Sequence, residues 1–179
     1  LSNLADLIID TTLSCILKII KTHTRISPEI AIIAFGKLGG KELGFASDLD
    51  LIFLTNHLNE NEQSLYFKVI KRFISWLSIS TSSGNLFNID LRLRPNGSSG
   101  LLVTSLNAFS EYQMNKAWLW EHQAVSRSRF CGGNKMIGNE FEKIRRNILK
   151  IKREPANLLE EIISMREKIT KSHVNNSKF

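Results

Sequence analysis

The chain is 179 residues long and 42% hydrophobic, a length that suits one domain with a single core. Its longest uninterrupted apolar stretch, Ile30 to Phe35, is far shorter than the roughly 20 residues that span a bilayer, which excludes a membrane-spanning helix. The net charge of +7 raises the question of nucleic acid, but residues 141–179 hold ten Lys or Arg against five Glu, which leaves +2 for the rest. We therefore expect a solvated basic surface and no nucleic-acid partner, with a polyanion site as the alternative.

The cysteines and the first residues bear on the compartment. Cys15 and Cys131 have no Cys-x-x-Cys spacing and no His at ligand spacing, so neither a zinc site nor a disulfide framework is indicated. Residues 1–10 contain two acids and no base, unlike the basic start of a secretory signal. We expect two reduced thiols in a cytoplasmic protein.

The first half of the chain predicts helix and strand in alternation. Apolar residues recur at three- and four-residue steps over residues 1–24, which predicts an amphipathic helix. Ile30 to Phe35 predicts a buried strand that opens into a glycine-bearing loop at residues 36–40, and Leu49 to Thr55 predicts a second strand. Residues 61–80 again have helical spacing.

The second half is predicted to begin with a strand and to continue as helices. Over residues 86–93 apolar residues alternate with polar and charged ones, which predicts a strand with one apolar and one charged face. Residues 95–100 have the composition of a turn. Helical spacing then predicts three further helices, at residues 106–130, 135–151 and 156–172.

Three aspartates carry the predicted chemistry. Residues i and i+2 of a strand point to the same side, so Asp48 and Asp50 are expected to project together from one face. Such a pair raises one carboxyl pKa, and a divalent cation relieves the repulsion; oxygen ligands favour Mg²⁺ or Mn²⁺. Asp90 is expected to join them if its strand pairs with theirs. Three carboxylates can hold two metal ions roughly 3.5 to 4 Å apart, an arrangement used in nucleotidyl transfer.

A glycine-rich turn and several basic residues are expected to bind phosphate. Glycines let a backbone approach a phosphate closely, with consecutive N–H groups pointing at it, and Lys or Arg neutralise a triphosphate. The residues assigned to this site are Gly39, Gly40, Ser47, Lys37, Arg92 and Arg94. Taken singly, the turn could be an ordinary loop and the arginines solvated strand charges. Their combination with the three aspartates favours a nucleotide site.

These residues lie in three blocks that together resemble a known enzyme family. The first is GKLGGKELGFASDLDLIFL, from Gly36 to Leu54, with Ala34 where the family has its first Gly. The second is DLRLRPNGSSGLLVTS, at residues 90–105, and the third is AWLWEHQA, at residues 117–124, followed by Arg127 and Arg129. Through them the chain resembles the DNA polymerase beta-like nucleotidyltransferases and, more closely, the glutamine synthetase adenylyltransferases.

The resemblance implies that AMP is transferred from ATP to a tyrosine of glutamine synthetase. Asp48 and Asp50 would bind the metal, and Asp90 would complete the site and assist in removing the tyrosine proton. Family members hold two similar halves, and the blocks found here are typical of the half that attaches AMP. In the full-length enzyme, a nitrogen-signalling regulatory protein is a further expected partner.

The expected fold class is α/β (α+β), a polymerase beta-like nucleotidyltransferase fold with a small mixed sheet flanked by helices. Residues 1–130 would form the core, with its helix at residues 1–24 and the sheet and metal site at residues 30–95. Residues 131–179 would form a helical extension. The chain starts without Met, and the family continues into a glycine-rich stretch and a helical domain, so we expect a truncated chain with reduced independent activity.

Three alternative functions stay open at this stage. The same metal site would serve phosphorolytic removal of AMP from glutamine synthetase. A non-catalytic fragment that binds ATP or glutamine synthetase is a second alternative, and a nucleic-acid transferase is a weaker third. Trp118, Glu121 and His122 are interpreted as packing residues at helical spacing and not as site residues.

Overall fold

The computed structural model describes residues 1–22, 24, 27–82, 84–155, 158–160 and 162–167. The chain divides into two compact units, Leu1–Leu149 and Lys150–Phe179. In the second unit, residues 155, 158–160 and 162–167 are helical, and the remainder of the helix expected at residues 156–172 lies outside the described residues. The boundary expected after residue 130 falls inside a strand of the first unit, because residues 129–133 pair with the sheet.

The first unit is built around a mixed sheet with the strand order β5-β2-β1-β7. Strand β1 (Ala31–Ala34) is antiparallel to both β2 (Leu49–Thr55) and β7 (Arg129–Gly133). Two short strands run parallel to β2 along its other edge, β5 (Ile89–Asp90) at its start and β6 (Val103–Ser105) at its end. The expected α/β fold with a small mixed sheet is confirmed.

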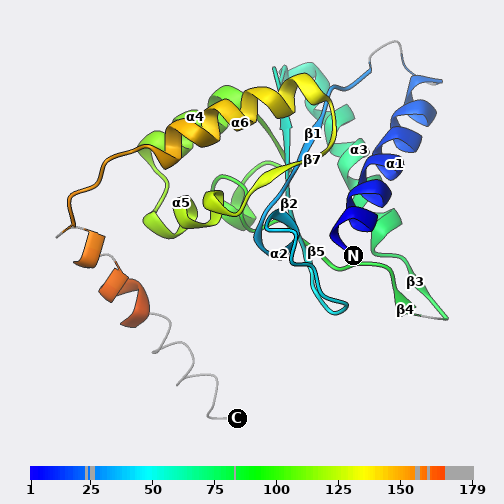
Figure 1. Ribbon diagram of the computed structural model, residues 1–179. Coiled ribbons are helices and arrows are strands. Elements are labelled where there is room, and N and C mark those ends of the chain that lie inside the picture. The colour runs from blue at the N-terminus through cyan, green and yellow to red at the C-terminus, as the bar shows by residue number, and fades with distance from the viewer. Residues whose placement is uncertain (23, 25–26, 83, 156–157, 161, 168–179) are drawn as a thin grey trace. The chain divides into compact units, whose positions relative to one another are not determined.

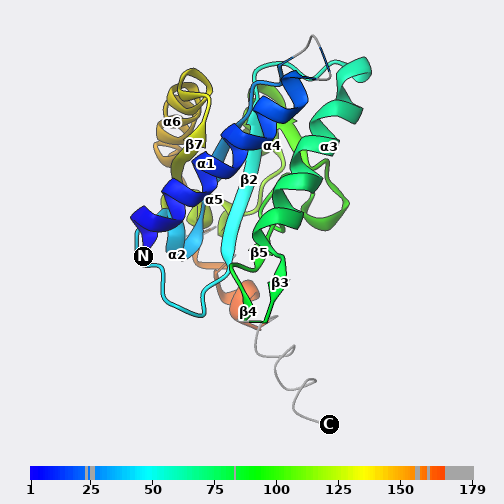
Figure 2. The same ribbon diagram turned by 90° about the vertical axis from the view of Figure 1, so that its right-hand side faces the viewer.

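Helices cover both faces of the sheet (Figure 1). Helices α1 (Ser2–Lys21) and α3 (Glu60–Leu77) lie on one face, in front of the sheet in Figure 2. The other face carries α4 (Leu106–Asn115), α5 (Leu119–Ser126) and α6 (Lys135–Leu149). The helices expected at residues 1–24, 61–80 and 135–151 are confirmed to within a few residues. Over the described ranges, no helix is long and apolar enough to cross a membrane.

Alternate residues of the central strand pack into the two layers of helices. Leu51 and Phe53 of β2 enter the main core, where the ring of Phe53 meets that of Phe73 edge-on, with 5.5 Å between the centroids. On the side of α4 and α6, Phe109 and Phe141 lie 5.8 Å apart, and both are fully buried. Strand β2, which carries the Asp-x-Asp motif at its start, is therefore held by packing on both faces.

The short elements differ most from expectation. The glycine-bearing segment after β1 is a helical turn, α2 (Gly36–Gly39), and not a loop. Of the strand expected at residues 86–93 only β5 is formed, and residues 97–99 form a single 3-10 turn, η1 (Gly97–Ser99). A two-stranded hairpin, β3 (Ser80–Thr81) with β4 (Gly84–Asn85), follows α3.

The single helix expected at residues 106–130 is wrong. Helix α4 ends at Asn115. Helix α5 starts after its own N-cap residue, Trp118, and the chain then enters β7. The Glu121 side chain accepts a hydrogen bond from the Trp118 backbone N–H at 2.8 Å, which caps the start of α5. Strand β7 depends on its pairing with β1, and helical periodicity in the sequence does not reveal such a tertiary partner.

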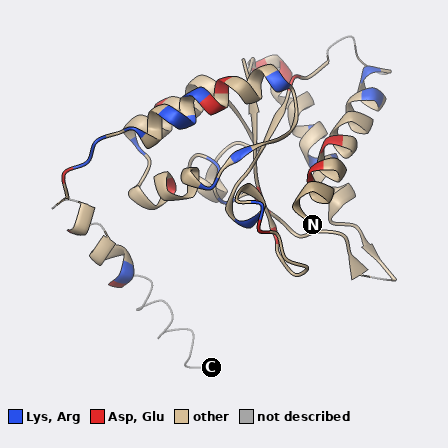
Figure 3. Cartoon of the chain, viewed as in Figure 1, with Lys and Arg blue, Asp and Glu red and all other residues tan. Residues whose placement is uncertain are grey.

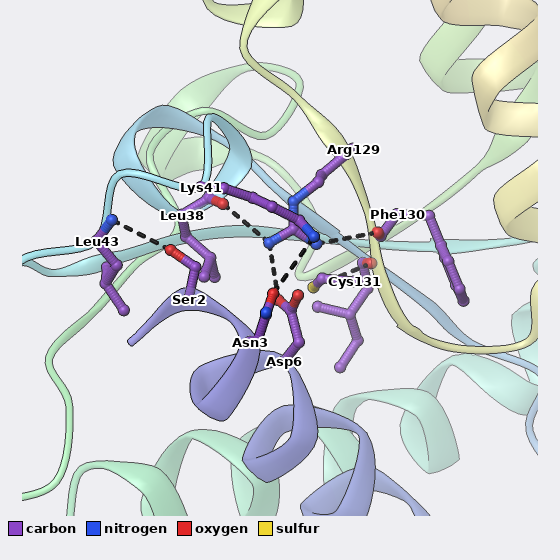
Figure 4. A network of polar contacts seen from close by, with 10 residues as sticks. Ser2, Asn3, Asp6, Leu38, Lys41, Leu43, Arg129, Phe130 and Cys131 are labelled. Carbon is purple, nitrogen blue, oxygen red and sulfur yellow. Dashed lines mark hydrogen bonds and ion pairs between the residues drawn. The ribbon is translucent and has the colours of Figure 1, made fainter.

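Arg129 joins the start of α1 to β7 and α2 (Figure 4). Its Nη2 donates to Asp6 Oδ1 at 2.9 Å and to the carbonyl of Leu38 at 2.9 Å. Both members of the ion pair are about four-fifths buried, at 19% and 20% side-chain exposure. Two further hydrogen bonds to the first turn of α1 come from Lys41 to Asn3 and from Leu43 to Ser2. Helix α2 and the loop after it are thereby fixed to the body of the first unit.

The charges on α6 are mixed in sign (Figure 3). Lys143 pairs with Glu140 at 2.6 Å and Arg145 with Glu142 at 3.4 Å, each across three residues of the same helix. Basic residues that alternate with acids in this way do not make a continuous positive surface. This arrangement supports the interpretation of the basic excess, as far as it lies on α6, as surface solvation.

Candidate nucleotide and metal site

Asp50 and Asp90 lie side by side in the sheet. Strands β2 and β5 are parallel, with Leu49 opposite Ile89 and Asp50 opposite Asp90. The backbone N–H of Leu49 donates to the carbonyl of Asn88 at 2.8 Å, which fixes this register. The expectation that strand pairing brings Asp90 beside the Asp48-x-Asp50 motif is confirmed for Asp50.

The electrostatics of Asp50 show that negative charges gather around it. Burial raises the pKa of Asp50 above its ordinary value, and the negative charges of Asp90 and Asp48 raise it further. The positive charges of Arg92 and Lys37 lower this pKa by smaller amounts. Five charged groups therefore act on one another at the start of β2. The carboxylates change the pKa of Asp50 more than the two bases do.

Asp90 is held by a neighbouring guanidinium. Arg92 Nε donates to its Oδ1 at 3.0 Å and its Oδ2 at 2.8 Å, and the Arg92 backbone N–H donates to Oδ1 at 2.8 Å. These hydrogen bonds hold the pKa of Asp90 below its ordinary value although burial acts in the opposite direction. Arg92 thus supplies beside Asp90 the positive charge that a bound cation would supply.

The three aspartates do not form a closed cluster. Across the described residues, no group of three or more His, Cys, Asp or Glu side chains is arranged so that it could hold a metal ion. Asp48 lies exposed before β2, while the oxygens of Asp90 face Arg92. The expected convergence of all three carboxylates is therefore wrong for this arrangement of side chains, and the role of the three as metal ligands stays a prediction.

Gly36 is a site residue that the sequence interpretation missed. It has a φ of +56°, a left-handed conformation that disfavours residues with a Cβ atom. A Cβ atom at Gly36 would also clash with Oδ2 of Asp50. The backbone N–H of Phe35, just before it, donates to the carbonyl of Asp50 at 2.9 Å. The start of α2 is thus packed directly against the Asp50 carboxylate.

The amides of Gly39 and Gly40 do not point outward. They donate to the carbonyls of Phe35 at 2.8 Å and Gly36 at 3.0 Å, as expected within a helical turn. The predicted phosphate cradle made from these two N–H groups is therefore wrong, because both donors are used inside α2. A role for the two glycines in admitting a ligand stays a prediction.

The remaining predicted phosphate residues have different surroundings. Lys37 is exposed on α2, close enough to Asp50 to lower its pKa. Ser47 accepts a hydrogen bond from the N–H of Gly44 at its Oγ, at 3.1 Å, so it shapes the loop before β2. Lys37 has the better placed side chain for an anion, since it is exposed beside the carboxylates, whereas Ser47 faces its own loop.

Arg94 braces its own loop. Its Nε donates to Gly100 at 3.1 Å, its Nη1 to Leu91 at 2.7 Å and its Nη2 to Ser98 at 2.8 Å, in each case to the backbone carbonyl. These three hydrogen bonds close the turn that follows Asp90. The structural role of Arg94 is therefore to hold the chain that leads away from the site, and contact with a triphosphate stays a prediction.

Glu121 and Tyr112 support the same turn. Glu121 is 6% exposed and accepts a hydrogen bond from the Tyr112 hydroxyl at 2.8 Å. Burial and Glu121 raise the pKa of Tyr112, while a hydrogen bond from the backbone of Asn96 lowers it. Glu121 thus holds Tyr112, which meets the turn, and this agrees with the interpretation of Glu121 as a packing residue.

Known proteins are similar to this chain over most of its length. Residues 1–144 match the family model described as glutamate-ammonia ligase adenylyltransferase. Relatives named bifunctional glutamine synthetase adenylyltransferase/adenylyl-removing enzyme are similar over nearly the whole chain. The protein of Ralstonia nicotianae is 47% identical over 179 residues, which cover 98% of this chain and 19% of that protein.

Two other relatives with the same name give a similar result. The protein of Aromatoleum aromaticum is 48% identical over 177 residues, 99% of this chain and 19% of that protein. The protein of Burkholderia mallei is 49% identical over 181 residues, 98% of this chain and 20% of that protein. The chain spans about a fifth of the length of the curated relatives it matches. Given the match of residues 1–144, the chain belongs to the glutamate-ammonia ligase adenylyltransferase family.

Proposed function

We propose that this chain transfers AMP from ATP to a tyrosine of glutamine synthetase. The observation that carries the proposal is the register that sets Asp50 against Asp90 at the start of β2, because nucleotidyl transfer with a metal needs carboxylates at one point. The names of the relatives, which include both adenylyl transfer and adenylyl removal, support an activity on glutamine synthetase.

The donor set fits Mg²⁺ or Mn²⁺. Asp48, Asp50 and Asp90 offer only oxygen ligands, and burial together with the negative charges of Asp90 and Asp48 raises the pKa of Asp50. When bound, the cation would neutralise phosphate oxygens and hold them in place. Asp90 would exchange its ion pair with Arg92 for the metal, which would free the Arg92 guanidinium to bind phosphate.

The residues of the chain then have distinct roles. Lys37 and Arg92 would neutralise the triphosphate, and Asp90 would assist in removing the proton of the acceptor tyrosine. The tyrosine oxygen would bond to the α-phosphorus while the bond to the departing pyrophosphate breaks. Most of the rate enhancement would come from positioning and from charge stabilisation.

The two thiols agree with a cytoplasmic enzyme. Cys15 and Cys131 are both free, the first exposed and the second buried. Burial raises the pKa of Cys131, so it stays a neutral thiol. An enzyme that acts on glutamine synthetase would need no oxidising compartment.

The test is to incubate the chain with glutamine synthetase, Mg²⁺ and ATP labelled at the α-phosphate. We expect label on a tyrosine of glutamine synthetase and release of pyrophosphate in equal amount. The identity of the products, and not the rate, decides which reaction the chain catalyses. Asp48→Asn should abolish labelling, whereas Glu111→Gln, which removes an exposed carboxylate of α4, should leave it unchanged. Formation of ADP from adenylylated glutamine synthetase and phosphate, without labelling, would favour the adenylyl-removing reaction.

A further inference from the structure

We propose that Arg127 binds the phosphates of the nucleotide, as a residue of the site that α2 and β2 form. The inference deepens the proposed function and rests on it. Arg127 lies far along the chain from the acidic motif, and the fold brings it against the glycine pair of α2. The ligand that Arg127 would bind is a nucleoside polyphosphate.

Both glycines of the pair meet Arg127. A Cβ atom at Gly39 would clash with the backbone carbonyl of Arg127. A Cβ atom at Gly40 would lie 3.0 Å from its Nη2 and 3.2 Å from its Nε. Gly40 has a φ of −77°, a conformation open to any residue, so backbone strain does not require glycine there. The space beside Gly40 is taken up by the Arg127 guanidinium and by its partner Glu42, whose Oε1 would lie 3.2 Å from the same Cβ atom.

The backbone of Arg127 is fixed on both sides. Its N–H donates to the carbonyl of Ala124 at 3.1 Å where α5 ends, and β7 begins two residues later. The carbonyl groups of Val125 and Ser126, just before it, accept hydrogen bonds from Arg145 of α6 at 3.1 and 2.7 Å. The side chain is therefore presented from a rigid segment, as a preorganised binding group requires.

Stability alone does not account for this arrangement. In the described part of the chain, the Arg127 guanidinium donates to Glu42 Oε2 at 2.6 Å, and both side chains are open to solvent, at 48% and 65% exposure. An exposed ion pair contributes about 0 to 1 kcal/mol. The ion pair thus contributes little to stability, whereas a binding role gives the guanidinium a reason to lie there.

The guanidinium lies one helical turn from the metal-binding side of the site. Gly36 contacts the Asp50 carboxylate, and Gly40 follows four residues later, a rise of about 6 Å along a helix. A nucleotide whose α-phosphate lies near Asp50 would extend its outer phosphates in the direction of Gly40. Because the amides of Gly39 and Gly40 are used inside α2, a side chain must supply the positive charge there. A guanidinium suits this task, since its five N–H donors match phosphate oxygens.

Calorimetric titration of the full chain with Mg²⁺-ATP, with AMP and with tripolyphosphate tests the proposal. Arg127→Ala should weaken binding of Mg²⁺-ATP and of tripolyphosphate about tenfold and leave AMP affinity within about twofold, because only the outer phosphates lose a contact. Arg127→Lys should give an intermediate affinity for Mg²⁺-ATP. Glu42→Gln and Arg146→Ala, which removes an exposed cation of α6, should stay within about twofold of the unaltered chain.

Three outcomes would overturn the inference. Unchanged Mg²⁺-ATP affinity in Arg127→Ala would show that Arg127 does not contact the nucleotide. Equal loss of ATP and AMP affinity would show that the substitution acts through the fold. If Glu42→Gln weakened Mg²⁺-ATP binding as much as Arg127→Ala, binding would depend on the ion pair and not on a contact between Arg127 and phosphate. Should Arg127→Ala unfold, the same comparison between Arg127→Lys and Glu42→Gln decides. An unaltered chain that binds no Mg²⁺-ATP would instead refute the proposed function itself.

Discussion

Replacing Asp50 by Asn is expected to stabilise the chain while it destroys the site. Asp50 lies opposite Asp90 on a neighbouring strand, and neighbouring strands are about 4.8 Å apart. Two like charges at that distance repel by roughly 3 kcal/mol at an effective dielectric constant of 20. Partial exposure and the charges of Arg92 and Lys37 reduce the net effect, so we expect a gain of about 1 kcal/mol.

The pH dependence gives the sign of the effect. Since the folded pKa of Asp50 is raised above 3.8, the folded chain binds more protons than the unfolded chain between 3.8 and the raised value. The contribution of Asp50 to stability therefore falls as pH rises through this window. An asparagine side chain does not titrate, so the gain from Asp50→Asn should be present at pH 7 and should disappear when the aspartates are protonated.

Thermal unfolding followed by circular dichroism in EDTA measures this effect. A gain of about 1 kcal/mol should raise the midpoint of a chain of this size by about 3 °C at neutral pH. Glu111→Gln serves as the control for loss of one exposed carboxylate and should change the midpoint by less than about 1 °C. A lower midpoint for Asp50→Asn would mean that Asp50 is a satisfied structural partner, and the reasoning would fail.

Three further predictions concern other parts of the structure. Gly36→Ala, at a φ of +56° beside the Asp50 carboxylate, should cost about 1 to 2 kcal/mol in urea unfolding and weaken Mg²⁺-ATP binding; normal ATP affinity would show that this contact is dispensable. Arg129→Ala should cost about 2 to 4 kcal/mol because it leaves Asp6 buried without its partner, whereas Arg146→Ala should cost less than about 0.5 kcal/mol; equal midpoints in urea would contradict the bracing role. Duplex DNA should bind no more tightly than about 10⁻⁶ M near physiological salt in a fluorescence titration, and submicromolar, sequence-selective binding would overturn the surface interpretation of the basic residues.

The parts of the fold that the sequence predicted are those with long or strictly local patterns. Helices α1, α3 and α6 have amphipathic periodicity over 15 or more residues, and β1 and β2 are short apolar runs next to glycine or aspartate. The pairing of Asp50 with Asp90 followed from strand periodicity and the assumption that two strands meet. These features depend on local chemistry, which the sequence displays directly.

The parts that the sequence did not predict depend on partners remote in the chain. Strands β6 and β7 are short and exist through pairing with β2 and β1. The prediction that the amides of Gly39 and Gly40 point outward was wrong because this segment forms a helical turn, in which both amides donate to backbone carbonyls. Arg127 contacts the same glycines although it lies 87 positions after Gly40 in the sequence. Periodicity carries no information on such a contact.

The most direct test of the central claim is a calorimetric titration with ATP in Mg²⁺ and again in EDTA. If the start of β2 is a metal-dependent nucleotide site, the chain should bind one ATP with Mg²⁺ and lose that binding in EDTA. Asp48→Asn and Asp90→Asn should lose it as well, with the circular dichroism spectrum unchanged, whereas Glu111→Gln should retain it. ATP binding that persists in EDTA, or that both aspartate variants keep at full affinity, would contradict the claim.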